Sequence, residues 1–142
     1  MTAVDLDKLE AQLTGEEGRK NKPYVDTRGN ITIGIGRNLR DNGIRDSEID
    51  FMFKNDIANV ERDLRAHLPW VFDLDEVRLR VFYDLCFNMG VTKLLTFTHM
   101  IAFAQVGDYT SAADELHHSI WDSEVGDRAP KLEAMLRTGE DQ

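Results

Sequence analysis

This sequence of 142 residues lacks several features that define whole classes of protein. Its only cysteine, Cys86, cannot form an internal disulfide, so the fold does not depend on an oxidising compartment. No apolar run approaches the roughly 20 residues of a transmembrane helix. The first residues, MTAVDLDKLEAQL, have no basic start and no continuous apolar run, so we expect no signal peptide. These absences favour a globular protein without stable membrane insertion.

Positive charge is also scarce. Lys and Arg number 17 against 26 Asp and Glu, which gives a net charge of −9 and argues against nucleic-acid binding. The charges are unevenly placed along the chain. Residues 1–45 carry eight basic and seven acidic side chains, whereas residues 46–142 carry nine and nineteen. The first third is therefore the only part without a strong negative bias.

Hydrophobic periodicity predicts an N-terminal helix and hairpin. A weak helical stripe covers residues 3–14, and Gly15 or Gly18 is placed to end the helix. The isoleucines of ITIGIG, at 31–36, alternate with smaller residues, which predicts a strand with one apolar face. DTRG, at 26–29, predicts the turn before that strand.

From residue 46 the period becomes helical. We expect a long amphipathic helix over 47–67, capped by Asp46 or Ser47 and stopped by Pro69. A buried central helix over 74–89 ends at Gly90. Shorter helices follow at about 94–105, 110–120 and 127–137, the last with Pro130 in its first turn.

These elements predict a mainly helical α+β fold. We expect a single domain, residues 1–142, with a small N-terminal β-hairpin lobe, a C-terminal helical bundle and a cleft between them. The β-hairpin region is 16–45, the connecting helix is 46–67, and the helical lobe combines 1–15 with 68–142.

Other kinds of site are weakly supported. The four histidines lack the spacing of metal ligands, and DTRGN lacks the alternating oxygen ligands of a calcium loop. GIGRNL lacks the third glycine of a dinucleotide-binding loop. Cys86 lies within an apolar helix, so we interpret it as a buried, inert thiol. We expect no metal ion and no cofactor.

Three polar residues around the hairpin suggest chemistry. Glu17 lies where a helix ends, Asp26 where a strand ends, and Thr32 on the returning strand. An acid that protonates a leaving oxygen and a carboxylate that activates water are what glycosidic hydrolysis requires. The alternative is that Asp26 only stabilises its own turn.

The stretch EGRKNKPYVDTRGNITIGIG resembles the E-G…Y-x-D…G-x-x-T-I-G-x-G signature of the phage lysozyme (endolysin) family, of the glycoside hydrolase family 24 type. LDEVRLRVFYDLCFNMG and DRAPKLEAMLRTG are similar to later helices of that family, so the resemblance covers nearly the whole chain. The sequence departs from the family in a shorter connection after Gly36 and in Arg37, where histidine is commoner.

The resemblance implies a lysozyme fold and a role for each matching residue. Glu17 would be the general acid, with Glu16 as the alternative in register, and Asp26 and Thr32 would position the water. Four residues would bind the substrate: Tyr24, Gly36, Phe87 and Asn88. Arg128 would give electrostatic support to the acid.

The implied activity is that of a muramidase. It would cut the β-1,4 bond between N-acetylmuramic acid and N-acetylglucosamine in peptidoglycan glycan strands, with inversion, and act as a monomer without nucleic acid. The resemblance also implies synthesis in a host cytoplasm and release through a holin-type lesion. Two alternatives stay open: a lytic transglycosylase on the same fold, and a non-catalytic wall-binding or structural protein.

Arg37 also suggests a structural contact. Asp56, on the long helix, occupies a family position that faces the end of the strand. We expect an ion pair between Arg37 and Asp56 that ties the hairpin to the helix.

Overall fold

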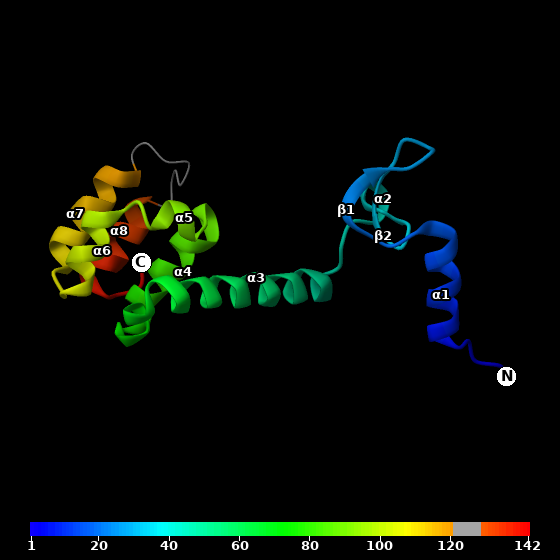
Figure 1. Ribbon diagram of the computed structural model, residues 1–142, viewed down its shortest axis with the longest axis horizontal. Helices are drawn as coiled ribbons and strands as arrows, with labels where there is room; N and C mark the ends of the chain where they lie inside the picture. The colour runs from blue at the N-terminus through cyan, green and yellow to red at the C-terminus, as the bar shows by residue number, and fades with distance from the viewer. Residues whose placement is uncertain (121–128) are drawn as a thin grey trace. The chain divides into compact units, whose positions relative to one another are not determined.

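The computed structural model describes residues 1–120 and 129–142, and nothing of the side chain of Ile120. The chain forms a mainly helical α+β fold with a small antiparallel sheet (Figure 1). It divides into two compact units, Met1–Phe51 and Met52–Gln142. The assignment of residues 1–15 to a helical lobe, and the cleft between lobes, stay predictions.

The first unit contains the sheet and two of the helices that Figure 1 draws in blue and cyan. Its strands follow one another in the order β1-β2-β3, so each pairs with its neighbour in sequence. The hairpin was predicted, whereas the third strand and the one-turn helix after it were not. The elements are α1 (Leu6–Glu17), β1 (Lys20–Val25), β2 (Ile31–Gly34), β3 (Arg37–Asn38) and α2 (Leu39–Asn42).

The register of the sheet shows how the two faces of β2 are buried. Tyr24 and Asn38 are the partners of Thr32 on either side, and Val25 is the partner of Ile31. Partners in register point to the same face of a sheet. Thr32 is 3% exposed while Ile31 is 52% exposed, so the more buried face at these positions is the one that carries the threonine. Alternation predicted the strand but not which of its faces is buried.

Helix α3 (Asp46–His67) begins in the first unit and continues into the second. Its first turn is closed by Glu48, whose carboxylate reaches back 2.7 Å to the N–H of Arg45. This is the reciprocal half of a capping box, with Arg45 as the flanking residue. The predicted caps, Asp46 and Ser47, are therefore wrong because both already lie inside the helix. Its end before Pro69 is confirmed.

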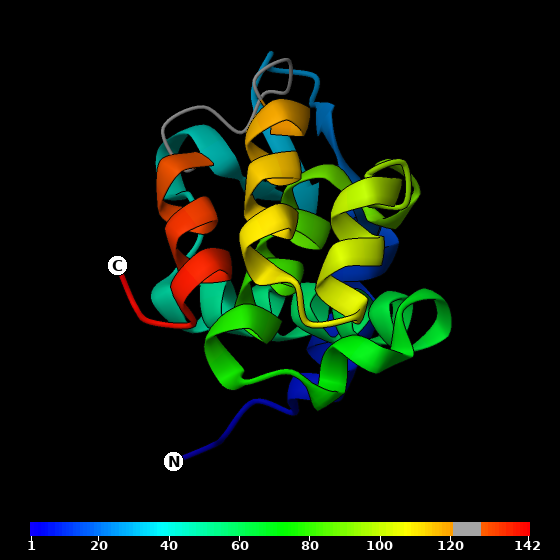
Figure 2. The same ribbon diagram turned by 90° about the vertical axis from the view of Figure 1, so that its left-hand side faces the viewer.

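The second unit is helical throughout its described residues. Figure 2 shows α6, α7 and α8 side by side, in yellow-green to red. The predicted 94–105 helix is in fact two, separated at residues 95–97. The remaining elements are η1 (Pro69–Asp73), α4 (Glu76–Met89), α5 (Val91–Leu94), α6 (Thr98–Gln105), α7 (Tyr109–Ile120) and α8 (Ala129–Thr138).

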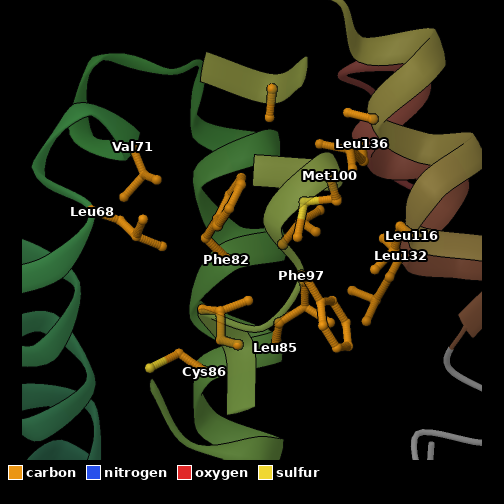
Figure 3. Packing of buried hydrophobic residues seen from close by; sticks show 14 of the residues in the cluster. Leu68, Val71, Phe82, Leu85, Cys86, Phe97, Met100, Leu116, Leu132 and Leu136 are labelled. Carbon is orange, nitrogen blue, oxygen red and sulfur yellow. The ribbon is translucent and has the colours of Figure 1, made fainter. Parts of the chain in front are cut away.

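The core of the second unit surrounds α4, as the continuous apolar pattern of that helix predicted. Phe82 and Leu85 are fully buried and lie among side chains from α6, α7 and α8 (Figure 3). Trp70 meets Phe82 edge to face with ring centroids 5.4 Å apart. Asp75 caps the start of α4, and Gly90 ends it with φ 80°. No helix among the described residues is both long enough and apolar enough to cross a lipid bilayer.

Candidate active site

Glu17 is the last residue of α1, and its carboxyl group lies against the backbone of Gly36. The helix ends there because Gly18 has φ 79° and donates its N–H to the carbonyl of Thr14. A β-carbon on Gly36 would lie 3.0 Å from Oε2 and 3.1 Å from Cδ of Glu17. Gly36 also has φ 69°, where other residues are strained. Position 36 therefore requires glycine for two reasons, and one of them is room for Glu17.

Asp26 follows β1 directly and organises the turn between β1 and β2. Its Oδ1 accepts the backbone N–H of Arg28 at 2.9 Å and that of Asn30 at 2.8 Å. Its own N–H donates to the carbonyl of Asn30 at 2.9 Å, and Gly29 donates to the carbonyl of Asp26 at 3.1 Å. The simpler interpretation of Asp26, as a residue that stabilises its own turn, is therefore part of what this carboxylate does.

The same hydrogen bonds act on the charge of Asp26. They lower its pKa, with the largest effect from the backbone N–H of Asn30. Burial opposes this shift and is the second-largest effect, and the N–H of Arg28, the side-chain amide of Asn30 and the positive charge of Arg28 each lower the pKa by less. Asp26 is thus held as a carboxylate, the form that accepts a proton from water.

Thr32 lies on the buried face of β2, between Tyr24 and Asn38 on the neighbouring strands. Its hydroxyl donates to the carbonyl of Asn30 at 3.1 Å. Asn30 therefore joins Asp26 to Thr32. The first unit links these two predicted residues through one turn and places Glu17 against Gly36, four residues beyond Thr32.

Glu16, the alternative acid, has a different environment from Glu17. Its Oε1 accepts a hydrogen bond from the side chain of Gln12, one turn back along α1, at 3.3 Å. The described residues of the first unit make no hydrogen bond or ion pair to the carboxylate of Glu17. Of the two neighbours, Glu17 is the one that contacts Gly36, in the turn between β2 and β3.

The other predicted site residues belong to the second unit. Phe87 and Asn88 lie near the end of α4 with exposed side chains. The Asn88 side-chain amide donates to the backbone carbonyl and the carboxylate of Asp84, at 2.9 and 2.6 Å. Arg128 lies outside the described residues. The substrate contacts of Phe87 and Asn88 stay predictions.

Arg37 forms an ion pair with Glu48, with 2.5 Å between Nη1 and Oε2. The expected pair with Asp56, a residue of the second unit, stays a prediction. The pKa of Glu48 is lowered to about 2, chiefly by the hydrogen bond from Arg37 and then by the N–H of Arg45. Sequence analysis missed both Glu48 and Asn30. The available signals were a glutamate three residues after a helix start, and an asparagine closing an Asp-led turn.

The part of the chain that the structure describes gives little support for a metal-binding site or for a nucleophilic cysteine. No three His, Cys, Asp or Glu side chains there lie close enough together to hold a metal ion. Cys86 is buried in α4, as predicted, and burial raises the pKa of its thiol. A thiol of this kind is a poor nucleophile.

One carboxylate at the end of the helix before a small antiparallel sheet and another in the first turn of that sheet, within a mainly helical α+β chain, indicate a protein of the lysozyme type. The family model "Phage lysozyme" matches residues 14–137. This chain belongs to the phage lysozyme family, as its sequence motifs indicated.

Three relatives show the range of the similarity. "Probable T4-type lysozyme 1" of Dictyostelium discoideum is 23% identical, over 92% of this chain and 94% of its own. "Probable T4-type lysozyme 2" of the same organism is 25% identical over the same shares. The "Pre-baseplate central spike protein Gp5" of Enterobacteria phage T4 is 25% identical over 89% of this chain, but this chain spans only 27% of that protein.

Proposed function

We propose that this protein is an endolysin-type muramidase. It hydrolyses the β-1,4 bond between N-acetylmuramic acid and N-acetylglucosamine in peptidoglycan glycan strands, and it needs no cofactor. Membership of the phage lysozyme family supports the substrate class. The observation that carries the proposal is the contrast between two carboxylates of the first unit. Turn amides hold Asp26 in its charged form, while Glu17 has no such donors among the described residues of that unit.

The proposed mechanism uses these two groups on opposite faces of the sugar. Glu17 donates its proton to the glycosidic oxygen as the bond from that oxygen to the anomeric carbon breaks. A water molecule forms the new bond to the anomeric carbon from the other side and gives a proton to Asp26. Thr32 helps to orient that water. The result is inversion, which requires carboxyl groups about 6.5–9.5 Å apart so that a water fits between them.

The other predicted residues support the substrate in this proposal. Tyr24 shares a sheet face with Thr32, and Gly36 keeps the backbone close to Glu17. Phe87 and Asn88 are proposed to contact the glycan, and Arg128 to support the charge of the acid. The site of action is the peptidoglycan layer, reached through a membrane lesion that another protein makes.

Mass spectrometry of products from purified peptidoglycan tests the activity. A muramidase releases fragments that end in a reducing N-acetylmuramic acid, and proton NMR early in the reaction identifies the α-anomer if the configuration inverts. Fragments that end in 1,6-anhydro sugars would show a lytic transglycosylase instead. Binding to the wall without any fragments would show a non-catalytic wall-binding protein.

A further inference from the structure

Asn30 is the residue that contacts both Asp26 and Thr32, and neither family signature letters nor spacing single it out. Its N–H donates to Oδ1 of Asp26 at 2.8 Å. Its carbonyl accepts the N–H of Asp26 at 2.9 Å and the hydroxyl of Thr32 at 3.1 Å. Its side-chain amide also acts to lower the pKa of Asp26.

These bonds fix the direction of the Thr32 hydroxyl. A carbonyl oxygen can only accept, so the single proton of the hydroxyl must point to Asn30. Thr32 can then offer only lone pairs to another partner. Asp26, held as a carboxylate by the turn amides, is also an acceptor. A water bound between the two residues would have to donate to both of them.

A water that donates both protons keeps its own lone pairs for a third direction. This is the orientation required for attack on an anomeric carbon, with one proton already directed at the base. If Thr32 were the donor, it would bind a lone pair of the water and weaken it as a nucleophile. The carbonyl of Asn30 therefore determines that the Thr32 hydroxyl accepts a hydrogen bond from the water and does not donate one to it.

We propose that Asn30 is a positioning residue that orients the attacking water through Asp26 and Thr32. Its carbonyl turns the Thr32 hydroxyl into an acceptor, and its backbone N–H holds the carboxylate of Asp26 in place. This inference rests on the proposed function, since it concerns the water of that reaction.

The side-chain part of the proposal is tested with Asn30→Ala, which keeps the backbone groups. Its matched control is Asn21→Ala, an exposed asparagine on β1. Carbon-13 NMR of the Asp26 carboxyl measures its pKa directly, and the pH dependence of kcat/KM measures it in action. We expect Asn30→Ala to raise the pKa of Asp26 and to move the acidic limb to higher pH, with a near-native melting temperature. Asn21→Ala should change neither.

The carbonyl part is tested by replacing Ile31 with its α-hydroxy acid. The resulting ester weakens the carbonyl of Asn30 as an acceptor, and the same replacement at Ile33 controls for a lost N–H on the same strand. Because one hydrogen bond contributes about 0.5–1.5 kcal/mol, we expect a roughly 3- to 10-fold lower kcat at position 31 than at position 33, with KM unchanged.

The outcomes separate this inference from the proposed function. An unchanged Asp26 pKa in folded Asn30→Ala, or equal kcat values for the two esters, would overturn the positioning role. If the wild-type protein releases no fragments from peptidoglycan, the proposed function fails and this inference fails with it. The NMR titration would still show in that case whether Asn30 holds Asp26.

Discussion

Arg37 of β3 donates a hydrogen bond to Glu48 in the first turn of α3, and the same carboxylate oxygen accepts the N–H of Arg45. One side chain therefore caps the helix and joins it to the sheet. The residue before Arg37 is Gly36, in the turn between β2 and β3, and it lies against Glu17. The ion pair thus anchors the backbone on which the proposed acid rests.

The pair of Arg37 and Glu48 should contribute to stability over a defined pH range. The hydrogen bond from Arg37 is the main reason why the pKa of Glu48 falls to about 2, below the ordinary glutamate value of about 4.3. The contribution is then present above the unfolded pKa and is lost as the pH falls toward 2. We expect Glu48→Gln to lower the melting temperature at pH 7, and the difference from wild type to shrink between about pH 4.5 and 2.

A double-mutant cycle isolates this pair from the capping bond. Arg37→Met with Glu48→Gln should be non-additive in thermal unfolding at pH 7, because the first change already removes the interaction. Arg37→Met with Asp56→Asn is the parallel cycle for the pair expected from the sequence. Additivity in the first cycle would contradict the assignment of Glu48 as a partner of Arg37, and coupling in the second would show that Asp56 also interacts with Arg37.

Gly36→Ala should impair the proposed acid more than it impairs the fold. The new β-carbon would lie 3.0 Å from Oε2 of Glu17, so that carboxyl must move. The carboxyl has to shift by a few tenths of an ångström. Because a displacement of about 1 Å in a reacting group can cost about 10²-fold in rate, we expect a smaller, roughly severalfold loss of kcat. The measurement is kcat on purified peptidoglycan together with the melting temperature.

Gly34→Ala is the control for Gly36→Ala. Gly34 has φ 68°, almost the value of Gly36, but a β-carbon there would meet nothing within 4 Å. Both substitutions therefore strain the backbone alike, and only one pushes on Glu17. Equal losses of kcat in the two variants would mean that backbone strain, and not the position of Glu17, controls activity.

Glu17→Gln tests the general acid itself. An amide of the same shape has no proton to donate, so we expect a loss of about 10²–10⁴-fold or more in kcat. Circular dichroism should show an unchanged fold, since the described residues of the first unit make no hydrogen bond to this carboxylate. Glu16→Gln, one residue earlier, should retain activity, and the opposite ranking of the two variants would move the acid to position 16.

The candidate site was predictable to the extent that its signals are local. The ends of α1 and β1, the turn at Asp26 and the spacing to Thr32 all lie within twenty residues, where glycine and turn chemistry act directly. The partner of Arg37 and the buried face of β2 depend on contacts between elements, which periodicity does not determine. For the same reason the contacts of Phe87 with substrate stay predictions.

Among the helices, too, boundaries set by local sequence were predicted and a boundary set by contacts between elements was not. Gly90 and Pro69 marked helix ends correctly because each acts on its own backbone, whereas the cap at Asp75 was missed and the helix was expected from residue 74. The break at residues 95–97 has no glycine or proline. Phe97 is buried in the core there, and Thr96 donates its hydroxyl to the carbonyl of Lys93 at 2.6 Å. Tertiary packing set this boundary, and the local pattern had predicted one continuous helix.

Replacing two phenylalanines of α4 by alanine should have different effects on stability and on substrate binding. Phe82 is fully buried and Phe87 is 48% exposed. Phe82→Ala should lower the free energy of unfolding by about 3–5 kcal/mol through the cavity it leaves. Phe87→Ala should change it by no more than about 0.5 kcal/mol and, if Phe87 contacts the glycan, should raise KM. Urea unfolding and steady-state kinetics on the same samples measure both, and a large loss of stability in Phe87→Ala would assign that residue to packing.

The distribution of charge predicts how salt affects activity. Residues 46–142 carry ten more acidic than basic side chains, whereas the basic residues of the hairpin region include the exposed Lys20, Lys22 and Arg28. Peptidoglycan carries carboxylates, so most of this chain is repelled by its proposed substrate, and the hairpin region should make the first contact. Salt shortens the range of such repulsion from about 30 Å at 0.01 M to about 10 Å at 0.1 M.

We therefore expect the rate of clearing of purified cell walls to hold or rise between about 0.01 and 0.1 M salt. Neutralising exposed acids of the second unit, as in Asp73→Asn combined with Glu140→Gln, should raise the rate at low salt and flatten its salt dependence. Neutralising Lys20 and Lys22 together should lower the rate at low salt, because it removes the attraction that opposes the repulsion. A steep, continuous loss of wild-type activity over the same range would mean that attraction by the hairpin region outweighs the repulsion, and the order of the two variants would then identify the residues responsible.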